Sequence, residues 1–316
     1  MTHSWFRQMI AGAFFASSLL AYGSSPWAKE APRLRLIDGY DGVPLNVAET
    51  GKPGSPGILF IHGNGQGYLS WKHQLESDLS QDFHVVAFDQ RGHGNSGKPW
   101  DADSYNRACI WAEDIAAVIR ETGLKKPVLV GWSRGGLMVM HYVRCLGIQD
   151  LAGIAMVAAR GRLVEAGLPT QETPARSSQR QLQSLDIEQN LVGAEVFSGL
   201  MTTKPMTGPL ADAFEVMNVM APPYARRAMS GPVFDPDGAE ITSYAGLQSQ
   251  LSLPFLVVLG EQDPFRDSVE MAANFSKALP HADVSIYPGV GHSPFVEQPD
   301  RFNAELRTFV LKANAD

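Results

Sequence analysis

Short apolar runs alternate along this chain with segments whose apolar residues return at helical spacing, and this alternation constrains the fold more than any other feature. Runs such as GILFI at 57–61, HVVAF at 84–88 and FLVVL at 255–259 are almost entirely apolar, which is typical of strands buried on both faces. We predict further strands at 34–37, 43–48, 128–132, 153–158 and 284–287, and helices at 71–79, 106–121, 135–146, 268–279 and 299–312. This order predicts a parallel sheet covered by helices on both faces.

The alternation stops between residues 160 and 250. This stretch has no run like FLVVL and is rich in Gln, Ser, Met and Pro. Leu210, Phe214, Met217 and Met220 form a helical stripe within it. We interpret 160–250 as a helical insertion over the sheet, in which most methionines fill the core. The α/β core is then expected at 29–159 and 251–316.

The first residues have a different character. Residues 9–21 (MIAGAFFASSLLA) form an apolar run too short to span a bilayer as a helix but of the length found in signal peptides. The small residues Ala21 and Gly23 fit a cleavage site, and Ala28 is a second candidate. We predict that 1–28 is a signal peptide and linker, that the protein is exported to the periplasm or secreted, and that it has no stable membrane insertion after processing. A buried N-terminal helix or a membrane tether is the alternative.

Charge and cysteine content narrow the possible functions. The formal net charge is -7, and no block of Lys and Arg is present, so we expect no nucleic-acid partner. No cluster of Cys and His has metal-ligand spacing, so no metal site is expected. Cys109 and Cys145 both fall on predicted helices. Export would permit a disulfide between them, but two buried thiols are an equal alternative.

A serine stands where the strand at 128–132 meets the helix at 135–146. The junction reads Gly131-Trp132-Ser133-Arg134-Gly135, the G-x-S-x-G pattern of a nucleophile elbow. The turn would hold the serine oxygen free above the sheet, and side chains in place of the two glycines would collide with the neighbouring strand and helix. Ser133 is therefore the predicted nucleophile. The alternative is a tight turn whose serine only caps the helix.

A serine nucleophile needs a base, and the base needs an acid to hold its tautomer. His292 follows the last predicted strand in the loop GVGHSPF, which suits a base on an irregular loop. Asp263 ends the preceding strand, where sites gather in open parallel sheets. Glu261 and Asp267 are rival carboxylates. The chain order Ser133, Asp263, His292 is the order expected for this arrangement.

The oxyanion of an acyl-transfer intermediate needs N–H donors aimed at it. We predict that one is the backbone N–H of Arg134, directly after the nucleophile. The second is predicted in the glycine-rich loop HGNGQG at 62–67, where Asn64 is best placed. A phosphate-binding loop is the alternative, but the Walker and dinucleotide patterns are both missing.

Two side chains flank the nucleophile. Trp132 is predicted to pack beneath the elbow. For the Arg134 side chain we predict an ion pair with an acidic residue of the insertion. The alternative is that the guanidinium faces the pocket and attracts an anionic acyl group.

The sequence resembles the α/β-hydrolase superfamily in five stretches, which run in the family's order: FIHGNGQG, FDQRGHGNSGKP, LVGWSRGG, VLGEQDPF and GVGHSPFVEQPDRF. They cover nearly the whole chain after residue 28, except the insertion. The resemblance implies an α/β fold with an eight-stranded, mostly parallel sheet, a helical cap inserted after the sixth strand, and no cofactor. It also implies that the loop at 89–99 is structural, with Arg91 and His93 packing or hydrogen bonding rather than reacting.

Within the superfamily, the chain looks most like small cap-domain esterases and the cofactor-free haloperoxidases and perhydrolases. The HGN loop also resembles haloalkane dehalogenases, but these enzymes and epoxide hydrolases use an aspartate where this chain has Ser133. We therefore expect a serine hydrolase that cleaves a carboxylic ester or lactone of a small molecule through an acyl-enzyme. A perhydrolase, acyltransferase, proline iminopeptidase or C–C hydrolase would use the same residues. A ligand-binding protein on the hydrolase fold is an alternative of another class, which the complete set of catalytic residue types disfavours.

Overall fold

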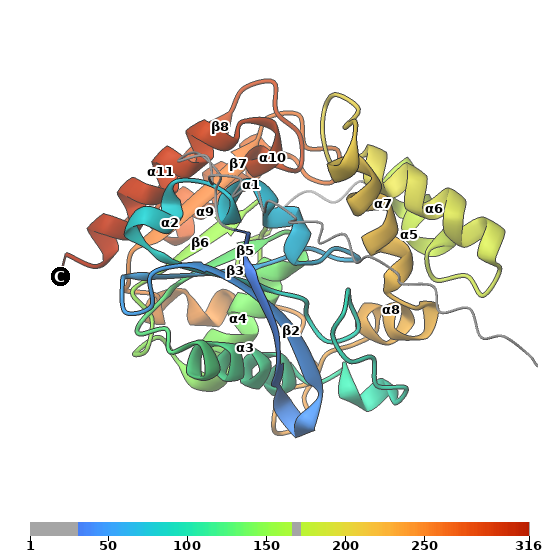
Figure 1. The fold of residues 1–316 in the computed structure, drawn as a ribbon, viewed down its shortest axis with the longest axis horizontal. Coiled ribbons are helices and arrows are strands. Elements are labelled where there is room, and N and C mark those ends of the chain that lie inside the picture. The colour runs from blue at the N-terminus through green and yellow to red at the C-terminus, as the bar shows by residue number, and fades with distance from the viewer. Residues whose placement is uncertain (1–30, 166–171, 316) are drawn as a thin grey trace, which may run out of the picture.

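The computed structural model describes residues 31–165 and 172–315, and these form a twisted eight-stranded sheet flanked by helices (Figure 1). The predicted signal segment at 1–28 lies outside the described residues. The sheet order is β1-β2-β4-β3-β5-β6-β7-β8. β2 pairs antiparallel with both β1 and β4, and all other neighbours are parallel. The strands are β1 Arg33–Asp38, β2 Pro44–Gly51, β3 Gly57–Ile61, β4 His84–Phe88, β5 Val128–Trp132, β6 Gly153–Val157, β7 Phe255–Gly260 and β8 Asp283–Tyr287.

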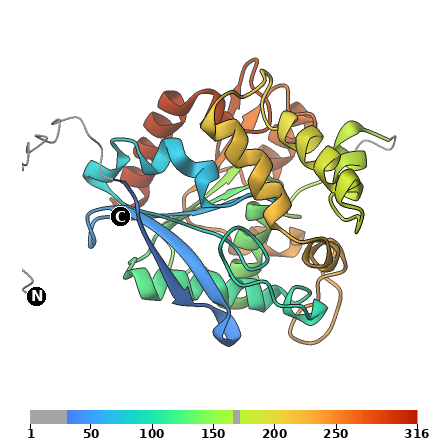
Figure 2. The same cartoon turned by 45° about the vertical axis from the view of Figure 1, so that its right-hand side comes forward.

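Helices cover the sheet on both faces, as the apolar strands predict (Figure 2). One buried cluster joins Leu59 and Ile61 of β3 to helices on one face, and a second joins Ile58 and Phe60 to helices on the other. The first face carries α3 Ala108–Thr122, α4 Arg134–Leu146 and α9 Ser268–Ala278. The second carries α1 Lys72–Leu75, α2 Leu79–Asp82, α10 Pro294–Glu297 and α11 Pro299–Ala313.

The predicted helix at 71–79 is wrong as a single element. A 3-10 turn at Tyr68–Trp71 leads into α1, and α2 follows after a break. Ser77 explains the break, because its hydroxyl donates to the Gln74 carbonyl at 2.7 Å and accepts from the Leu79 N–H at 3.2 Å. A serine that bonds to nearby backbone in this way competes with helical hydrogen bonds.

Among the described residues, four α-helices lie between β6 and β7 in the chain and group at the right of the sheet in Figure 1. They are α5 Pro174–Gln181, α6 Ile187–Gly199, α7 Pro209–Met220 and α8 Pro223–Ser230. They belong to the stretch where we expected a helical insertion. Phe214 and Met217 of the predicted stripe are buried in the same cluster as Trp132 of β5, so the insertion and the sheet share a core.

Cys109 and Cys145 form a disulfide between the first turn of α3 and the last turn of α4, with their Cα atoms 5.5 Å apart. The structure thus decides between the two alternatives that the spacing left open. Within the described part of the chain, no helix is long and apolar enough to cross a membrane.

Candidate active site

Ser133 lies at the turn from β5 into α4 with a strained backbone, φ 54° and ψ -116°. Non-glycine residues rarely adopt positive φ, and the cost is on the order of 1–3 kcal/mol. The neighbours hold the turn in place: the Ser133 N–H donates to the Val157 carbonyl at 2.9 Å, and its carbonyl accepts from the Gly136 N–H at 3.1 Å. The strand–turn–helix setting that the sequence predicts is therefore present.

The glycines on either side are needed for the reason the sequence suggests. A Cβ on Gly131 would lie 2.7 Å from the backbone of Gly136 in α4. A Cβ on Gly135 would lie 2.1 Å from the Ile61 carbonyl oxygen of β3. Both contacts are with backbone, which cannot move aside as a flexible side chain could. Strand and helix can approach this closely only with glycine at both positions.

His292 and Asp263 come together at the carboxyl end of the sheet. The His292 Nδ1 lies 2.7 Å from the Asp263 Oδ2, and both side chains are buried. The Asp263 Oδ1 accepts from the Phe265 N–H at 2.8 Å. An aspartate in this position holds the proton of the histidine on Nδ1 and leaves Nε2 as a base.

The two rival carboxylates have other partners. Glu261 accepts from the Gly289 N–H at 2.8 Å and is exposed. Asp267 caps the first turn of α9 by accepting from the Glu270 N–H at 2.9 Å. Of the three carboxylates that the sequence offered, Asp263 is the one the structure brings to His292.

Trp132 does more than fill space beneath the elbow. It packs there as predicted, and its Nε1 donates to the His292 carbonyl at 2.8 Å. The Phe265 ring lies 4.4 Å from the imidazole, centre to centre. These two contacts fix the histidine loop, and sequence reasoning missed both. The position of Phe265 two residues after Asp263 was the available signal.

Asn64 and Arg134 lie at the same cavity as Ser133 and His292. The Asn64 N–H has no hydrogen-bond acceptor among the described residues. Arg134 is the first residue of α4, so its N–H has no acceptor within the helix. Gly63 lets this loop approach the elbow, because a Cβ there would lie 3.2 Å from the Ser133 Cβ. Within the described residues the His292 side chain is hydrogen bonded to Asp263 and not to Ser133. A bond between nucleophile and base often tightens only when substrate binds.

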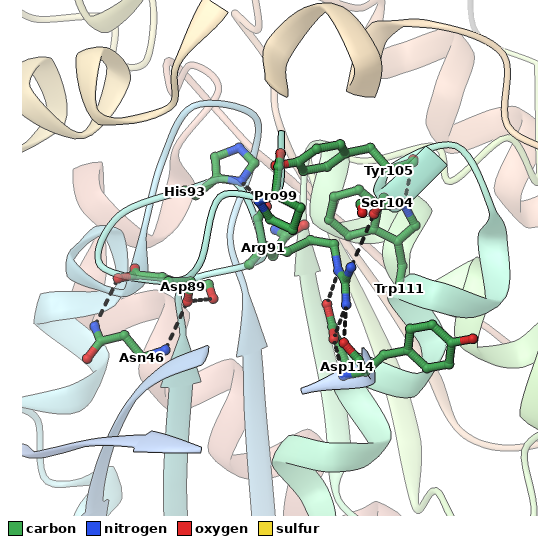
Figure 3. Close-up of polar contacts among 12 residues, drawn as sticks. Asn46, Asp89, Arg91, His93, Pro99, Ser104, Tyr105, Trp111 and Asp114 are labelled. Carbon is green, nitrogen blue, oxygen red and sulfur yellow. Dashed lines mark hydrogen bonds and ion pairs between the residues drawn. The ribbon is translucent and has the colours of Figure 1, made fainter. Parts of the chain in front are cut away.

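The loop after β4 makes buried polar contacts with its neighbours, in the structural role that the resemblance implies (Figure 3). Asp89 accepts from the Tyr68 N–H at 2.8 Å and from the Asn46 amide at 2.9 Å, which ties three segments together. Arg91 forms a buried two-pronged ion pair with Asp114 of α3, at 2.5 and 2.7 Å. These bonds organise the backbone of the loop.

The cavity itself has a volume of about 380 Å³ and lies at the carboxyl ends of the strands. Its wall combines the elbow, the loops after β3, β6 and β7, and residues of α5, α6 and α8. A volume of this size suits a small organic ligand. Among the described residues, no group of three His, Cys, Asp or Glu side chains could hold a metal ion.

The ion pair predicted for the Arg134 side chain is wrong. Its Nη1 donates to the Met229 carbonyl of α8 at 3.0 Å, and its guanidinium lies 5.1 Å from the centre of the Trp111 ring. Its Nε and Nη2 are buried and have no partner in the described structure. The insertion does contact Arg134, but through a backbone carbonyl, and the ring beside the guanidinium, that of Trp111, belongs to α3. Sequence alone could not distinguish this from a carboxylate partner.

Comparisons with known proteins agree with this architecture. The sequence matches the alpha/beta hydrolase family over residues 58–305. A bifunctional esterase/perhydrolase of Acinetobacter calcoaceticus is 26% identical over 277 residues, covering 85% of this chain and 97% of that protein. Epoxide hydrolase A of Mycobacterium tuberculosis is 33% identical over 144 residues, but this covers only 46% of this chain and 42% of that protein.

The solved structures agree as well. An esterase from Rhodococcus sp. ECU1013 has a TM-score of 0.76 and 28% identity, covering 89% of this chain and 99% of its own. Because the family match extends over most of the chain, the chain belongs to the alpha/beta hydrolase family of enzymes.

Proposed function

We propose that this enzyme is a serine hydrolase that cleaves a carboxylic ester or lactone of a small molecule through an acyl-enzyme. One observation carries the proposal: the strained Ser133 opens onto the same cavity as a His292 that is hydrogen bonded to Asp263. A serine that only capped α4 would bond to the helix N-terminus, but Ser133 makes no side-chain cap bond. The similar esterase structure and the esterase/perhydrolase relative support the same reaction class.

The proposed reaction has two steps. His292 Nε2 takes the Ser133 proton as Oγ attacks the carbonyl carbon, and Asp263 stabilises the imidazolium through Nδ1. The N–H groups of Asn64 and Arg134 bind the oxyanion. The imidazolium then protonates the leaving alcohol, and the acyl-enzyme remains. Water attacks this ester with His292 as the base again, and the acid leaves with Ser133 restored.

Replacing Ser133 by Ala tests the proposal. We expect the hydrolysis of a panel of p-nitrophenyl esters, from acetate to decanoate, and of several lactones to fall to the background rate, because losing a triad nucleophile costs on the order of 10⁶ in turnover. Ser252→Ala, at an exposed serine, is the matched control and should keep wild-type rates. Circular dichroism checks that both variants fold. A folded Ser133→Ala variant with full activity would contradict the mechanism.

A perhydrolase is the second candidate, because the relative from Acinetobacter calcoaceticus combines esterase and perhydrolase activity and matches 85% of this chain. Hydrogen peroxide would then replace water in the second step. Formation of peroxyacetate from an acetate ester and hydrogen peroxide, compared with release of acetate, measures the partition. Proline iminopeptidase and C–C hydrolase activities remain candidates because they need the same residues.

We also propose that the protein is exported. The apolar run at 9–21 supports this, and so does the disulfide between Cys109 and Cys145, because disulfides persist in oxidising compartments.

A further inference from the structure

The cavity beside Ser133 is strongly cationic, although the whole chain has a net charge of -7. Five of its lining residues are arginines, and none of the described residues that line it is acidic. The arginines come from separate parts of the chain and meet only in the folded protein. They are Arg134 at the start of α4, Arg160 and Arg162 after β6, Arg176 in α5 and Arg266 after β7.

None of the five arginines forms an ion pair with a described residue. Arg162 and Arg266 each donate to a backbone carbonyl, those of Ile241 and Phe265. The side chains of Arg160 and Arg176 make no hydrogen bond within the described ranges, and both are only partly exposed.

Three carboxylates interact with these arginines, but each has another partner or is exposed. Glu172 interacts with Arg176 but forms its ion pair with Arg180. The charge of Asp263 raises the pKa of Arg266, but its carboxylate is hydrogen bonded to His292. The charge of Glu240 raises the pKa of Arg162, but Glu240 is exposed to solvent. The cavity therefore keeps an excess of positive charge.

The charges of the arginines also lower the pKa values of their neighbours in the cluster. Burial, followed by the charge of Arg162, lowers the pKa of Arg134 to about 10. Burial also lowers the pKa of Arg266, and the charges of Arg160 and Arg176 add to this effect while Asp263 opposes it. A cluster of cations that outnumber the nearby carboxylates raises the free energy of the empty site, and a bound anion would lower it.

The loop that carries Arg160 and Arg162 is strained. Ala158 and Arg162, neither of them glycine, have positive φ, at 46° and 57°. A distant segment holds this conformation, because the Arg162 carbonyl accepts from the Tyr244 N–H at 2.8 Å. Strained backbone concentrates at ligand sites, where the surrounding structure imposes it. Here it places two arginines on the cavity wall.

We infer that the substrate carries, besides the bond that is cleaved, an anionic carboxylate or phosphate group, and that Arg160, Arg176 and Arg266 bind it beside Ser133. This inference rests on the proposed ester hydrolase function and specifies its substrate class. Guanidinium groups match carboxylate and phosphate oxygens with paired N–H donors, and such charge-assisted bonds are about twice as strong as neutral ones. A neutral substrate of the same shape would leave these cations without a counterion.

Sets of anionic substrates, each compared with a neutral amide of similar length, test the inference. Monoethyl adipate has a carboxylate on its acyl side, and ethyl 5-carbamoylpentanoate is its neutral counterpart. 4-Acetoxybutanoate and 3-acetoxypropyl phosphate carry a carboxylate or a phosphate on the alcohol side, and 4-acetoxybutanamide is neutral. For either the acyl-side or the alcohol-side substrates, we expect kcat/KM to be at least tenfold higher for the anionic member than for the neutral one. The side with this advantage is the side of the substrate that carries the anion. The advantage should shrink in 0.5 M NaCl, as ionic screening requires.

Single substitutions then locate the binding groups. Arg160→Gln and Arg176→Gln should each lower the anionic-to-neutral ratio of kcat/KM about tenfold, the size expected for one charge-assisted hydrogen bond. Arg120→Gln is the matched control, because Arg120 lies on α3, is 64% exposed and pairs with Glu121. It should leave both the ratio and the basal rate unchanged.

A binding measurement separates failure of this inference from failure of the proposed function. Isothermal titration calorimetry of the Ser133→Ala variant with the same substrate pairs needs no turnover. Tighter binding of the anionic member supports the inference even if hydrolysis proves not to depend on Ser133. Equal binding of both members, or serine-dependent hydrolysis that is as fast for the neutral member in every arm, would overturn it.

Discussion

His62 holds the loop of Asn64 in place, and its hydrogen bonds require a neutral imidazole. Its Nε2 accepts from the Gln90 N–H at 2.9 Å, so the ring proton is on Nδ1, which donates to the Gly63 carbonyl at 2.7 Å. Burial lowers the pKa of His62 to about 4. His93 packs against it at 4.9 Å between ring centres, and burial followed by the charge of His62 keeps the pKa of His93 low as well.

This pair predicts a loss of stability in acid. The folded-state pKa of His62 is below the value of 6.5 expected in the unfolded chain, so the unfolded state takes up the proton first as pH falls. The stabilisation is complete above about pH 6.5 and is lost towards pH 4. From His62 alone, we expect the free energy of unfolding to drop by about 2 kcal/mol between pH 7 and pH 5. Urea unfolding at the two pH values measures it.

Two variants make this measurement specific. His62→Gln can still accept from the Gln90 N–H but cannot titrate, so its drop should be smaller than that of the wild type. His281→Gln, at an exposed histidine, should retain the wild-type drop. An unchanged pH dependence in His62→Gln would refute the assignment to His62.

Much of the site was predictable at the scale of residues because each role demands a rare combination of residue type and position. Ser133 needs glycine on both sides and a strand before it, and Asp263 and His292 each follow a strand. The Arg134 side chain shows the limit. A sequence shows that a charge is present, but the guanidinium's neighbours, Met229 and Trp111, come from elements that only the fold brings together.

At the scale of elements, the disulfide joins α3 to α4, the helix that begins directly after Ser133. The two cysteines are 36 residues apart in sequence. Closing a loop of this length restricts the unfolded chain and stabilises the folded state by about 2–4 kcal/mol. The spacing of the cysteines could not predict the bond, because the contact depends on how the two helices pack.

We expect the double substitution Cys109→Ala and Cys145→Ala to lower the free energy of unfolding by about 2–4 kcal/mol, measured by urea unfolding. Dithiothreitol should destabilise the wild type by a similar amount and leave the double variant unaffected, which serves as the internal control. If the double variant is as stable as the oxidised wild type, the disulfide makes no net contribution.

At the scale of the whole molecule, the sheet could be predicted from the sequence because its inner strands are buried on both faces and are therefore apolar throughout. Prediction fails where the sequence has no such apolar pattern. The helix expected at 71–79 breaks at Ser77, and the cavity wall is built from loops such as 158–162 whose backbone angles leave no pattern in the sequence. The sequence therefore could not predict that five arginines line one cavity, although it contains each of them.

Export is the remaining prediction at this scale, and it concerns residues 1–28, which lie outside the described structure. The apolar run at 9–21 and the disulfide lead to the same expectation by independent routes, one through targeting and one through the redox compartment. Expression of the full chain in a bacterial host, followed by fractionation and mass spectrometry of the intact protein, measures the compartment, the N-terminus and the oxidation state of the cysteines. We expect the periplasmic or secreted form to begin after Gly23 or Ala28 and to be 2 Da lighter than the reduced protein, because forming a disulfide removes two hydrogens. Exported protein that retains Met1 would refute cleavage, and protein confined to the cytoplasm with free thiols would refute export.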